Sequence, residues 1–270
     1  MVVQHNMTSL NANRQLGITV NNQAKATEKL SSGYKVNRAG DDAAGLTISE
    51  KMRSQIRGLN KASTNAEDGI SAIQTAEGAL NEAHEILQRM NELATQAAND
   101  TNTSSDRAAI QKEIDALTSE IDRIASTTQF NTMNLLDGTF TSKNLQVGAL
   151  EGQGITISVT TMNAKALGVA SLAVSSFTVA GSAMTKVQAA ISKVSSQRSA
   201  LGALQNRLEH TVKNLDTTAE NTQAAESRIR DTDMADAMVD YSKNNILQQA
   251  GQSMLAQANS ANQGVLSLLQ

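Results

Sequence analysis

The side chains that could do chemistry in this chain are two groups of acids. Asp41 and Asp42 could hold a Mg²⁺ or Ca²⁺ ion, and so could Asp231, Asp233 and Asp236. Each group adjoins the start of a periodic segment, where a carboxylate can accept hydrogen bonds from the free N–H groups of a helix. We therefore expect both groups to cap helices, with a cation at the second group as the alternative.

The histidines and glycines give no sign of a catalytic or cofactor site. His5, His84 and His210 are far apart in the chain, and none has a ligand or nucleophile partner at a diagnostic spacing. The glycines at residues 33–45 lack the preceding strand and the lysine of a phosphate-binding loop. The chain has no cysteine, which excludes disulfides and cysteine-bound metals. The sequence predicts a protein that is not an enzyme and has no cofactor or metal.

Composition favours long helices and argues against nucleic-acid binding and membrane insertion. The 270 residues include no proline, which breaks helix interiors, and only 2% of them are aromatic. A net charge of −3 without a long basic run speaks against nucleic acid. No apolar run approaches the roughly 18 residues needed to span a membrane. Residues 1–7 carry neither a basic leader nor a long apolar stretch, so we expect no cleaved signal peptide.

One apolar seam dominates the first half of the chain. Its residues recur in steps of three and four that average about 3.5, which is the spacing of a coiled coil. The helix would be about 75 Å long, and it carries too much apolar surface to remain in water without a partner. The seam consists of Ile48, Met52, Ile56, Leu59, Ala62, Ala66, Ile70, Ile73, Ala76, Leu80, Ala83, Leu87, Met90, Leu93 and Ala97.

A second long helix is expected in the other half. A polar breaker at residues 99–105 separates the first seam from a shorter helix around 110–124, and residues 144–159 read as a short antiparallel hairpin. Heptads return near Lys186 and continue to Arg230. The predicted fold is mainly α, with long antiparallel coiled-coil helices from both halves of the chain and a small central β-hairpin region.

The C-terminal segment from Asn244 to Gln270 carries no charged side chain, yet it keeps a heptad rhythm. Its apolar residues lie on more than one face of a helix, so that helix must be buried on several faces. We expect copies of the chain to bury these residues against one another, together with apolar residues of the N-terminus. The predicted polymerisation core is Val3, Met7, Leu10, Leu247, Met254, Leu255, Val265, Leu266, Leu268 and Leu269.

Several stretches of the sequence resemble bacterial flagellin, the filament subunit of the flagellum. They lie at residues 31–46 (SSGYKVNRAGDDAAGL), 66–80 and 129–131 in the first half, and at residues 228–235 and 245–270 in the second. The resemblance covers about residues 1–160 and 186–270. It identifies the chain as a short member of that family, because only residues 160–185 remain where larger members carry outer domains.

The resemblance implies an organisation, a location and a set of partners. Residues 1–40 would be the N-terminal part of a filament-core domain with its linker, and residues 234–270 its C-terminal helix. Residues 41–185 would be the N-terminal part of a coiled-coil shell domain that includes the hairpin region, and residues 186–233 its C-terminal helix. The chain would be exported by a type III-like flagellar apparatus, with a chaperone on its C-terminal segment. It would then polymerise into the extracellular filament that drives motility, in contact with flagellar cap and hook-junction proteins.

Some members of the family are also ligands of a Toll-like receptor of innate immunity. The segment that such receptors recognise resembles residues 88–99 of this chain, supported by the next helix. The residues carried over are Gln88, Arg89, Leu93, Gln96, Ile110 and Glu113.

A signalling hairpin similar to the cytoplasmic part of a chemoreceptor is the alternative. It would also have antiparallel heptads rich in Ala, Gln and Glu and no cysteine. Its heptads would continue through the tip, however, whereas residues 128–185 carry glycines, threonines and an alternating strand. It would also leave the uncharged C-terminal segment unexplained.

Overall fold

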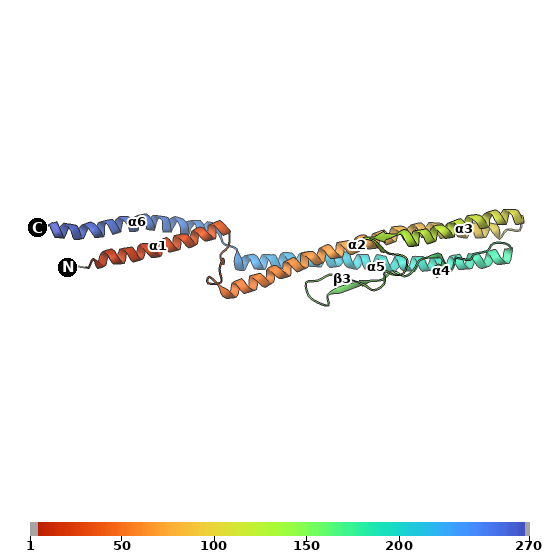
Figure 1. The fold of residues 1–270 in the computed structure, drawn as a ribbon, viewed down its shortest axis with the longest axis horizontal. Coiled ribbons are helices and arrows are strands. Elements are labelled where there is room, and N and C mark those ends of the chain that lie inside the picture. Colours follow the sequence, from red (N-terminus) through yellow and green to blue (C-terminus); the bar gives the residue numbers. More distant parts are fainter. Residues whose placement is uncertain (1–4, 268–270) are drawn as a thin grey trace. The chain divides into compact units, whose positions relative to one another are not determined.

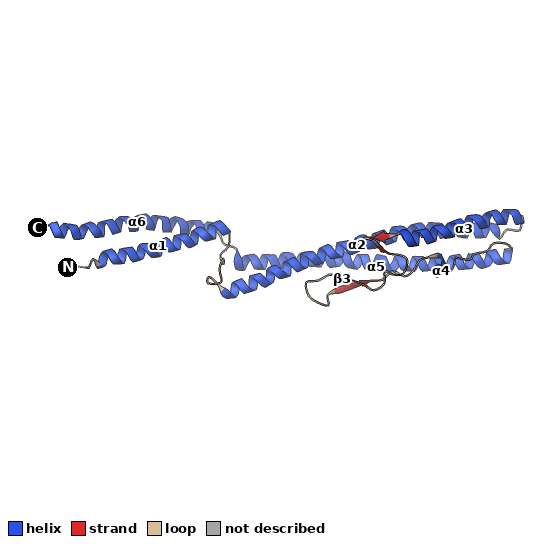
Figure 2. Cartoon of the chain, viewed as in Figure 1, coloured by secondary structure: helices blue, strands red, loops and turns tan. Residues whose placement is uncertain are grey.

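Six helices and four short strands make up the part of the chain that the computed structural model describes, residues 5–267 with side chains up to residue 260 (Figures 1 and 2). Contacts divide the chain into unit 1, Met1–Ser54 with Asn221–Gln270, and unit 2, Gln55–Glu220. The elements are α1 (Met7–Ser32), α2 (Ala43–Ala97), α3 (Ser104–Thr127), β1 (Gln129–Phe130), β2 (Met133–Asn134), β3 (Lys143–Gln146), β4 (Gly154–Ile157), α4 (Ala164–Leu167), α5 (Phe177–Arg230) and α6 (Met234–Ser267).

Unit 2 is built on an antiparallel pairing of α2 with α5. Ser63 Oγ donates a hydrogen bond of 3.0 Å to Asp216, and Arg198 lies 3.8 Å from Glu77. Residue numbers therefore rise along α2 while they fall along α5. This confirms the prediction that long helices from opposite halves of the chain pair side by side.

The core of unit 2 lies between α2, α3 and α5. The α2 seam that the sequence predicts is buried from Leu59 to Ala97, apart from the half-buried Ile70. Near its start the seam is displaced by one residue: Ile48 is exposed, whereas Ser49 is buried and donates to the Leu46 carbonyl. The largest fully buried helical side chains of unit 2 are Ile73, Leu80, Leu87, Met90, Leu93, Ile114, Ile121, Leu201 and Leu208.

The polar segment between α2 and α3 ends one helix and starts the next. Arg107 donates to the Ala97 carbonyl at the end of α2 and forms an ion pair with Asp100. Thr103 and Asp106 form a capping box at the start of α3, in which each side chain accepts a hydrogen bond from the other residue's backbone N–H. Side-chain and backbone hydrogen bonds from Thr103 lower the pKa of Asp106.

The central region contains more regular structure than the sequence indicates. The expected hairpin is present as β3 and β4, which pair antiparallel with Leu145 opposite Ile155. A second small sheet, formed by β1 and β2, was not predicted. Helix α5 begins at Phe177 and not near Lys186. Its first turns bury the small residues Ala180 and Ala183, which give only a weak apolar pattern in the sequence, so the prediction missed them.

Glycines on α2 make room for the chain that follows β3. A Cβ atom added at Gly58 would lie 2.9 Å from Ala149 Cβ and 3.3 Å from its Cα. At Gly78, by contrast, an added Cβ would meet no described atom within 4 Å. Gly58 and Gly78 lie on the same helix but differ in their surroundings. Substituting each with alanine therefore distinguishes the effect of helix propensity from the effect of packing.

We predict that Gly58→Ala destabilises unit 2 by about 1–3 kcal/mol, since the new methyl group must displace the Ala149 backbone. Gly78→Ala should stabilise the protein by about 0.4–1 kcal/mol, because alanine restricts the unfolded chain and nothing obstructs its side chain. Urea unfolding of the monomer, followed by circular dichroism, measures both. Equal shifts in the same direction would contradict the packing described here.

Candidate assembly and recognition surfaces

Helices α1 and α6 pair antiparallel within unit 1. Asn6 Nδ2 donates a hydrogen bond of 2.9 Å to the Ala258 carbonyl, and Ser9 Oγ lies 2.7 Å from Asn259 Oδ1. Further along, the Leu16 side chain packs beside Gly251, where an added Cβ would lie 3.2 Å from Leu16 Cδ1. The pairing of the two terminal segments agrees with the sequence-based expectation.

The contact between these helices consists mainly of small and polar side chains. On each helix, residues in steps of three and four are less exposed than their neighbours, as in a coiled coil, but few of them are large and apolar. The seam residues on α1 are Ser9, Ala12, Leu16, Thr19, Gln23, Ala26 and Leu30. Those on α6 are Ala237, Tyr241, Asn244, Gln248, Gly251, Leu255 and Ala258.

Most of the larger apolar side chains of both helices lie outside this contact and are exposed. Met7 and Leu10 on α1 are 69% and 60% exposed, and a groove of about 450 Å³ lies between them and Arg14. On α6 the exposed fractions of Ile246 and Met254 are 67% and 64%. The full outward set on the described part of the two helices is Met7, Leu10, Ile18, Val20, Met234, Met238, Val239, Ile246, Leu247 and Met254. Monomers rarely expose so many apolar side chains together unless the surface binds something.

The residues predicted for the polymerisation core fall into four groups. Met7, Leu10, Leu247 and Met254 belong to the outward set, whereas Leu255 is half-buried on the side facing α1. Val265 and Leu266 lie in α6 beyond the described side chains, and Val3, Leu268 and Leu269 lie outside the described residues. The sequence did not single out Ile18, Met238 and Val239, although their spacing relative to Leu10 and Ile246 could have indicated them.

The residues carried over from receptor-binding relatives lie on α2 and α3 of unit 2. Gln88, Arg89, Gln96 and Glu113 are exposed. Arg89 joins the two helices through Glu113, with Nε 3.0 Å from its carboxylate, and also pairs with Glu92; these bonds raise the pKa of Arg89.

Leu93 and Ile110 are buried in the core of unit 2, so neither offers contact area beside these exposed side chains.

One acid of each acidic group caps a helix. Asp42 Oδ1 accepts a hydrogen bond from the Gly45 N–H at the start of α2, and Asp233 Oδ1 accepts from the Ala235 N–H at the start of α6. This confirms the capping interpretation for Asp42 and Asp233. Within the described part of the chain, no group of three or more His, Cys, Asp or Glu side chains could hold a metal ion, and no helix combines the length and apolar character needed to cross a membrane.

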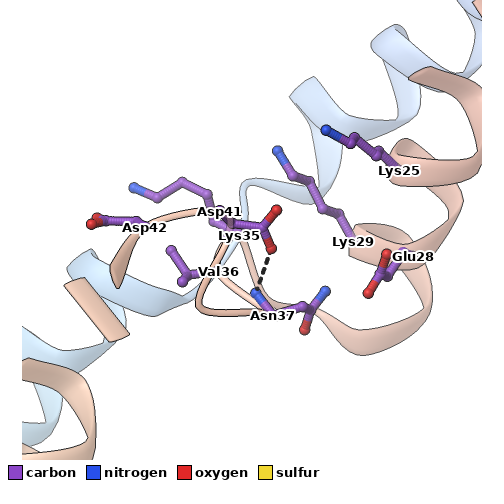
Figure 3. Close-up of a pocket in the computed structure, with 9 residues that line it drawn as sticks. Lys25, Glu28, Lys29, Lys35, Val36, Asn37, Asp41 and Asp42 are labelled. Carbon is purple, nitrogen blue, oxygen red and sulfur yellow. Dashed lines mark hydrogen bonds between the residues drawn. The ribbon is translucent and has the colours of Figure 1, made fainter. Parts of the chain in front are cut away.

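Asp41 organises the linker between α1 and α2. Its carboxylate accepts hydrogen bonds from the Arg38 and Asn37 N–H groups at 3.0 and 3.2 Å, at the edge of a pocket of about 360 Å³ (Figure 3). These bonds, first that from Arg38 and then that from Asn37, lower the pKa of Asp41, and the charges of Lys25 and Lys29 add to the effect. The linker is therefore a folded turn.

Comparisons with known proteins give one consistent result. Residues 3–141 match the family described as the bacterial flagellin N-terminal helical region, and residues 184–269 match the bacterial flagellin C-terminal helical region. The chain is 56% identical to a flagellin of Halalkalibacterium halodurans and 52% identical to a flagellar filament 31.3 kDa core protein of Treponema maltophilum, each alignment covering all of both chains. A crystal structure of Bacillus cereus flagellin is 34% identical, with a TM-score of 0.51, over 60% of this chain and 94% of that one.

We predict that the linker loosens at low pH. Because folding lowers the pKa of Asp41, its carboxylate stabilises the turn above the unfolded value of about 3.9, and this contribution disappears as the pH falls through the lower folded pKa. The amide proton shifts of Asn37 and Arg38 in NMR spectra should report that titration. Asp41→Ala should displace both signals already at neutral pH, whereas Asp68→Ala on the exposed side of α2 should leave them in place.

Proposed function

Since this chain belongs to the bacterial flagellin family, whose members are structural proteins and not enzymes, we propose that copies of it polymerise through α1 and α6 into the extracellular flagellar filament that drives motility. The observation that carries this proposal is the orientation of the apolar side chains of unit 1. The α1–α6 contact uses small and polar residues, which leaves Leu10, Leu247 and Met254 in water. Burying a large apolar side chain is worth about 1.5–3 kcal/mol, so association of many copies gains what the single chain lacks.

We extend this proposal to the organisation of the filament and to its assembly route. Residues 1–40 and 234–270 supply the filament core, and residues 41–185 and 186–233 the surrounding shell, with the predicted core residues in contact between copies. Export through the flagellar apparatus, a chaperone on the C-terminal segment and contacts with cap and hook-junction proteins follow from the family likeness. The exposed apolar face of α6 is the kind of surface that a chaperone would need to cover.

The alternative of a chemoreceptor-like signalling hairpin has no support. The β3–β4 hairpin and the irregular segment after it interrupt the heptads between α3 and α5. The family matches on both sides of this interruption belong to flagellins.

We also propose, from the family likeness, that the surface around Arg89 binds a Toll-like receptor. The exposed side chains Gln88, Arg89, Gln96 and Glu113 lie on two neighbouring helices, and the ion pair between Arg89 and Glu113 restrains the guanidinium. A side chain held in this way loses little conformational freedom when a partner docks. Leu93 and Ile110 contribute by packing beneath this surface.

We predict that Leu247→Ser with Met254→Ser raises the critical concentration for polymerisation at least about a hundredfold, because two apolar contacts of roughly 1.5–3 kcal/mol each are lost. Gln249→Ser with Gln252→Ser, on the same helix but polar from the start, is the matched control. Sedimentation and electron microscopy of the refolded protein provide the measurement. Filaments should also be absent after deletion of residues 244–270, while unit 2 keeps its helical circular dichroism; normal filaments from the truncated chain would contradict the proposal.

We predict that Arg89→Ala weakens binding of the monomer to the receptor ectodomain about tenfold or more, as expected for loss of a central charged contact. Arg123→Ala is the control, because Arg123 is likewise an exposed arginine that forms an ion pair, with Glu120 on α3. Surface plasmon resonance with immobilised ectodomain compares the two variants. No measurable affinity of the unaltered monomer would rule out receptor binding.

A further inference from the structure

Two connecting segments of unit 1 meet in a crossing. They are residues 33–35, which follow α1, and residues 230–232, at the junction of α5 and α6. Tyr34 and Asp231 form an antiparallel β-bridge. The Lys35 N–H donates a hydrogen bond of 2.7 Å to the Arg230 carbonyl, and the Thr232 N–H donates one of 3.0 Å to the Gly33 carbonyl. The crossing therefore ties the end of α1 to the point where α5 ends and α6 is about to begin.

The side chain of Arg230 contacts residues on both sides of this crossing, Tyr34 and Glu50. Its guanidinium lies 4.6 Å from the centroid of the Tyr34 ring, and Nη1 lies 3.2 Å from Glu50 Oε1 on α2. The Arg230 side chain is only 12% exposed, whereas that of Glu50 is 57% exposed. The buried Nε of Arg230 has no hydrogen-bond partner among the described residues. The guanidinium thus lies over the Tyr34 ring at cation–π distance and forms an ion pair with the Glu50 carboxylate.

The crossing joins parts of the chain that are far apart in sequence. Arg230 and Glu50 are separated by 180 residues, so these contacts form only when both halves of the chain are present. Once they form, the end of α1 and the start of α6 share an anchor. Pairing of the two helices then becomes a local event with a small loop-closure cost. This matters here because the α1–α6 contact contains few large apolar residues that could hold the helices in register by themselves.

We propose that Tyr34, Arg230 and Glu50 form a latch that must be closed before the subunit can polymerise. The closed latch sets the register of α1 against α6, and only in that register do the outward apolar residues of both helices match the surface of a second copy. Arg230 is then a positioning residue, which acts through the helix pair without touching the neighbouring copy. This inference rests on the proposed polymerisation.

An engineered disulfide that can be oxidised or reduced tests the latch within a single variant. The chain has no cysteine, so Tyr34→Cys with Asp231→Cys introduces the only thiols. Facing residues on antiparallel strands have Cα atoms about 4.5–5.5 Å apart, within the roughly 4.4–6.8 Å that a disulfide spans. The reduced variant lacks the Tyr34 ring and therefore leaves the latch open, whereas the oxidised variant closes the crossing covalently. The oxidised variant should polymerise, and reduction should raise its critical concentration at least about tenfold.

The unaltered protein, with and without reductant, is the control and should polymerise equally in both conditions. Hydrogen exchange in the monomer gives a second readout: the Lys35 and Thr232 amides should exchange faster in the reduced variant, while amides in the core of unit 2 stay protected. Equal assembly of the oxidised and reduced variants would overturn the latch and leave the filament proposal intact. Failure of the oxidised variant to assemble would overturn it as well, whereas failure of the unaltered protein would overturn the filament proposal itself.

If the reduced variant also loses protection in unit 2, Arg230→Lys decides the question. This substitution keeps a positive charge toward Glu50 and removes the guanidinium that lies over the Tyr34 ring. It should raise the critical concentration severalfold, with unit 2 unaffected. An unchanged critical concentration would show that the guanidinium is not needed for assembly.

Discussion

Small and polar side chains hold α1 against α6, and the behaviour of unit 1 depends on this choice of residues. A coiled coil normally buries its largest apolar residues in the seam between its helices. Here the seam contains Ala12, Gln248 and Gly251, while Leu10 and Met254 face outward. The pair is consequently weak by itself, since helical stability in proteins comes mostly from packing an apolar face. In the filament proposed above, other copies would cover that face, so folding of the terminal helices and assembly would be coupled.

Unit 2 has the opposite arrangement. Its helices α2, α3 and α5 share a continuous core of side chains such as Leu87, Ile114 and Leu201, all fully buried within a single chain. Close contacts such as that between Gly58 and Ala149 fix the chain after β3 against α2. The subunit therefore combines a unit that can fold alone with a unit whose apolar surface remains available. This division fits the proposed polymerisation, in which unit 1 buries its apolar side chains against other copies.

The sequence predicted the features that large apolar residues determine. The α2 seam from Leu59 onward, the antiparallel partner helix and the β3–β4 hairpin are all confirmed. The features that were not predicted occur where small or polar residues determine the structure. In α2, Ser49 lies in the buried stripe and Ile48 does not. Ala180 and Ala183 extend α5 toward Phe177. The α6 seam runs through Asn244 and Gln248. Such residues give no hydrophobic periodicity, so the face of α6 that meets α1 could not be identified beforehand. The crossing at Arg230 was missed for a similar reason, because its contacts join residues that are distant in sequence.

The absence of charge from residues 244–270 has a physical reason that links these observations. A charged side chain in that segment would lose much of its hydration when copies pack around it, at a cost of several kcal/mol. Asparagine, glutamine and serine lose far less, provided that each finds a hydrogen-bond partner. Asn6 bonded to the Ala258 carbonyl and Ser9 beside Asn259 show that the α1–α6 contact supplies such partners within one chain. These two contacts are therefore made within one chain, and in the proposed filament the exposed apolar side chains are the surface left to bury. A helix pair of this kind tolerates water before polymerisation and its exclusion afterwards, which a seam of leucines or of ion pairs would not allow.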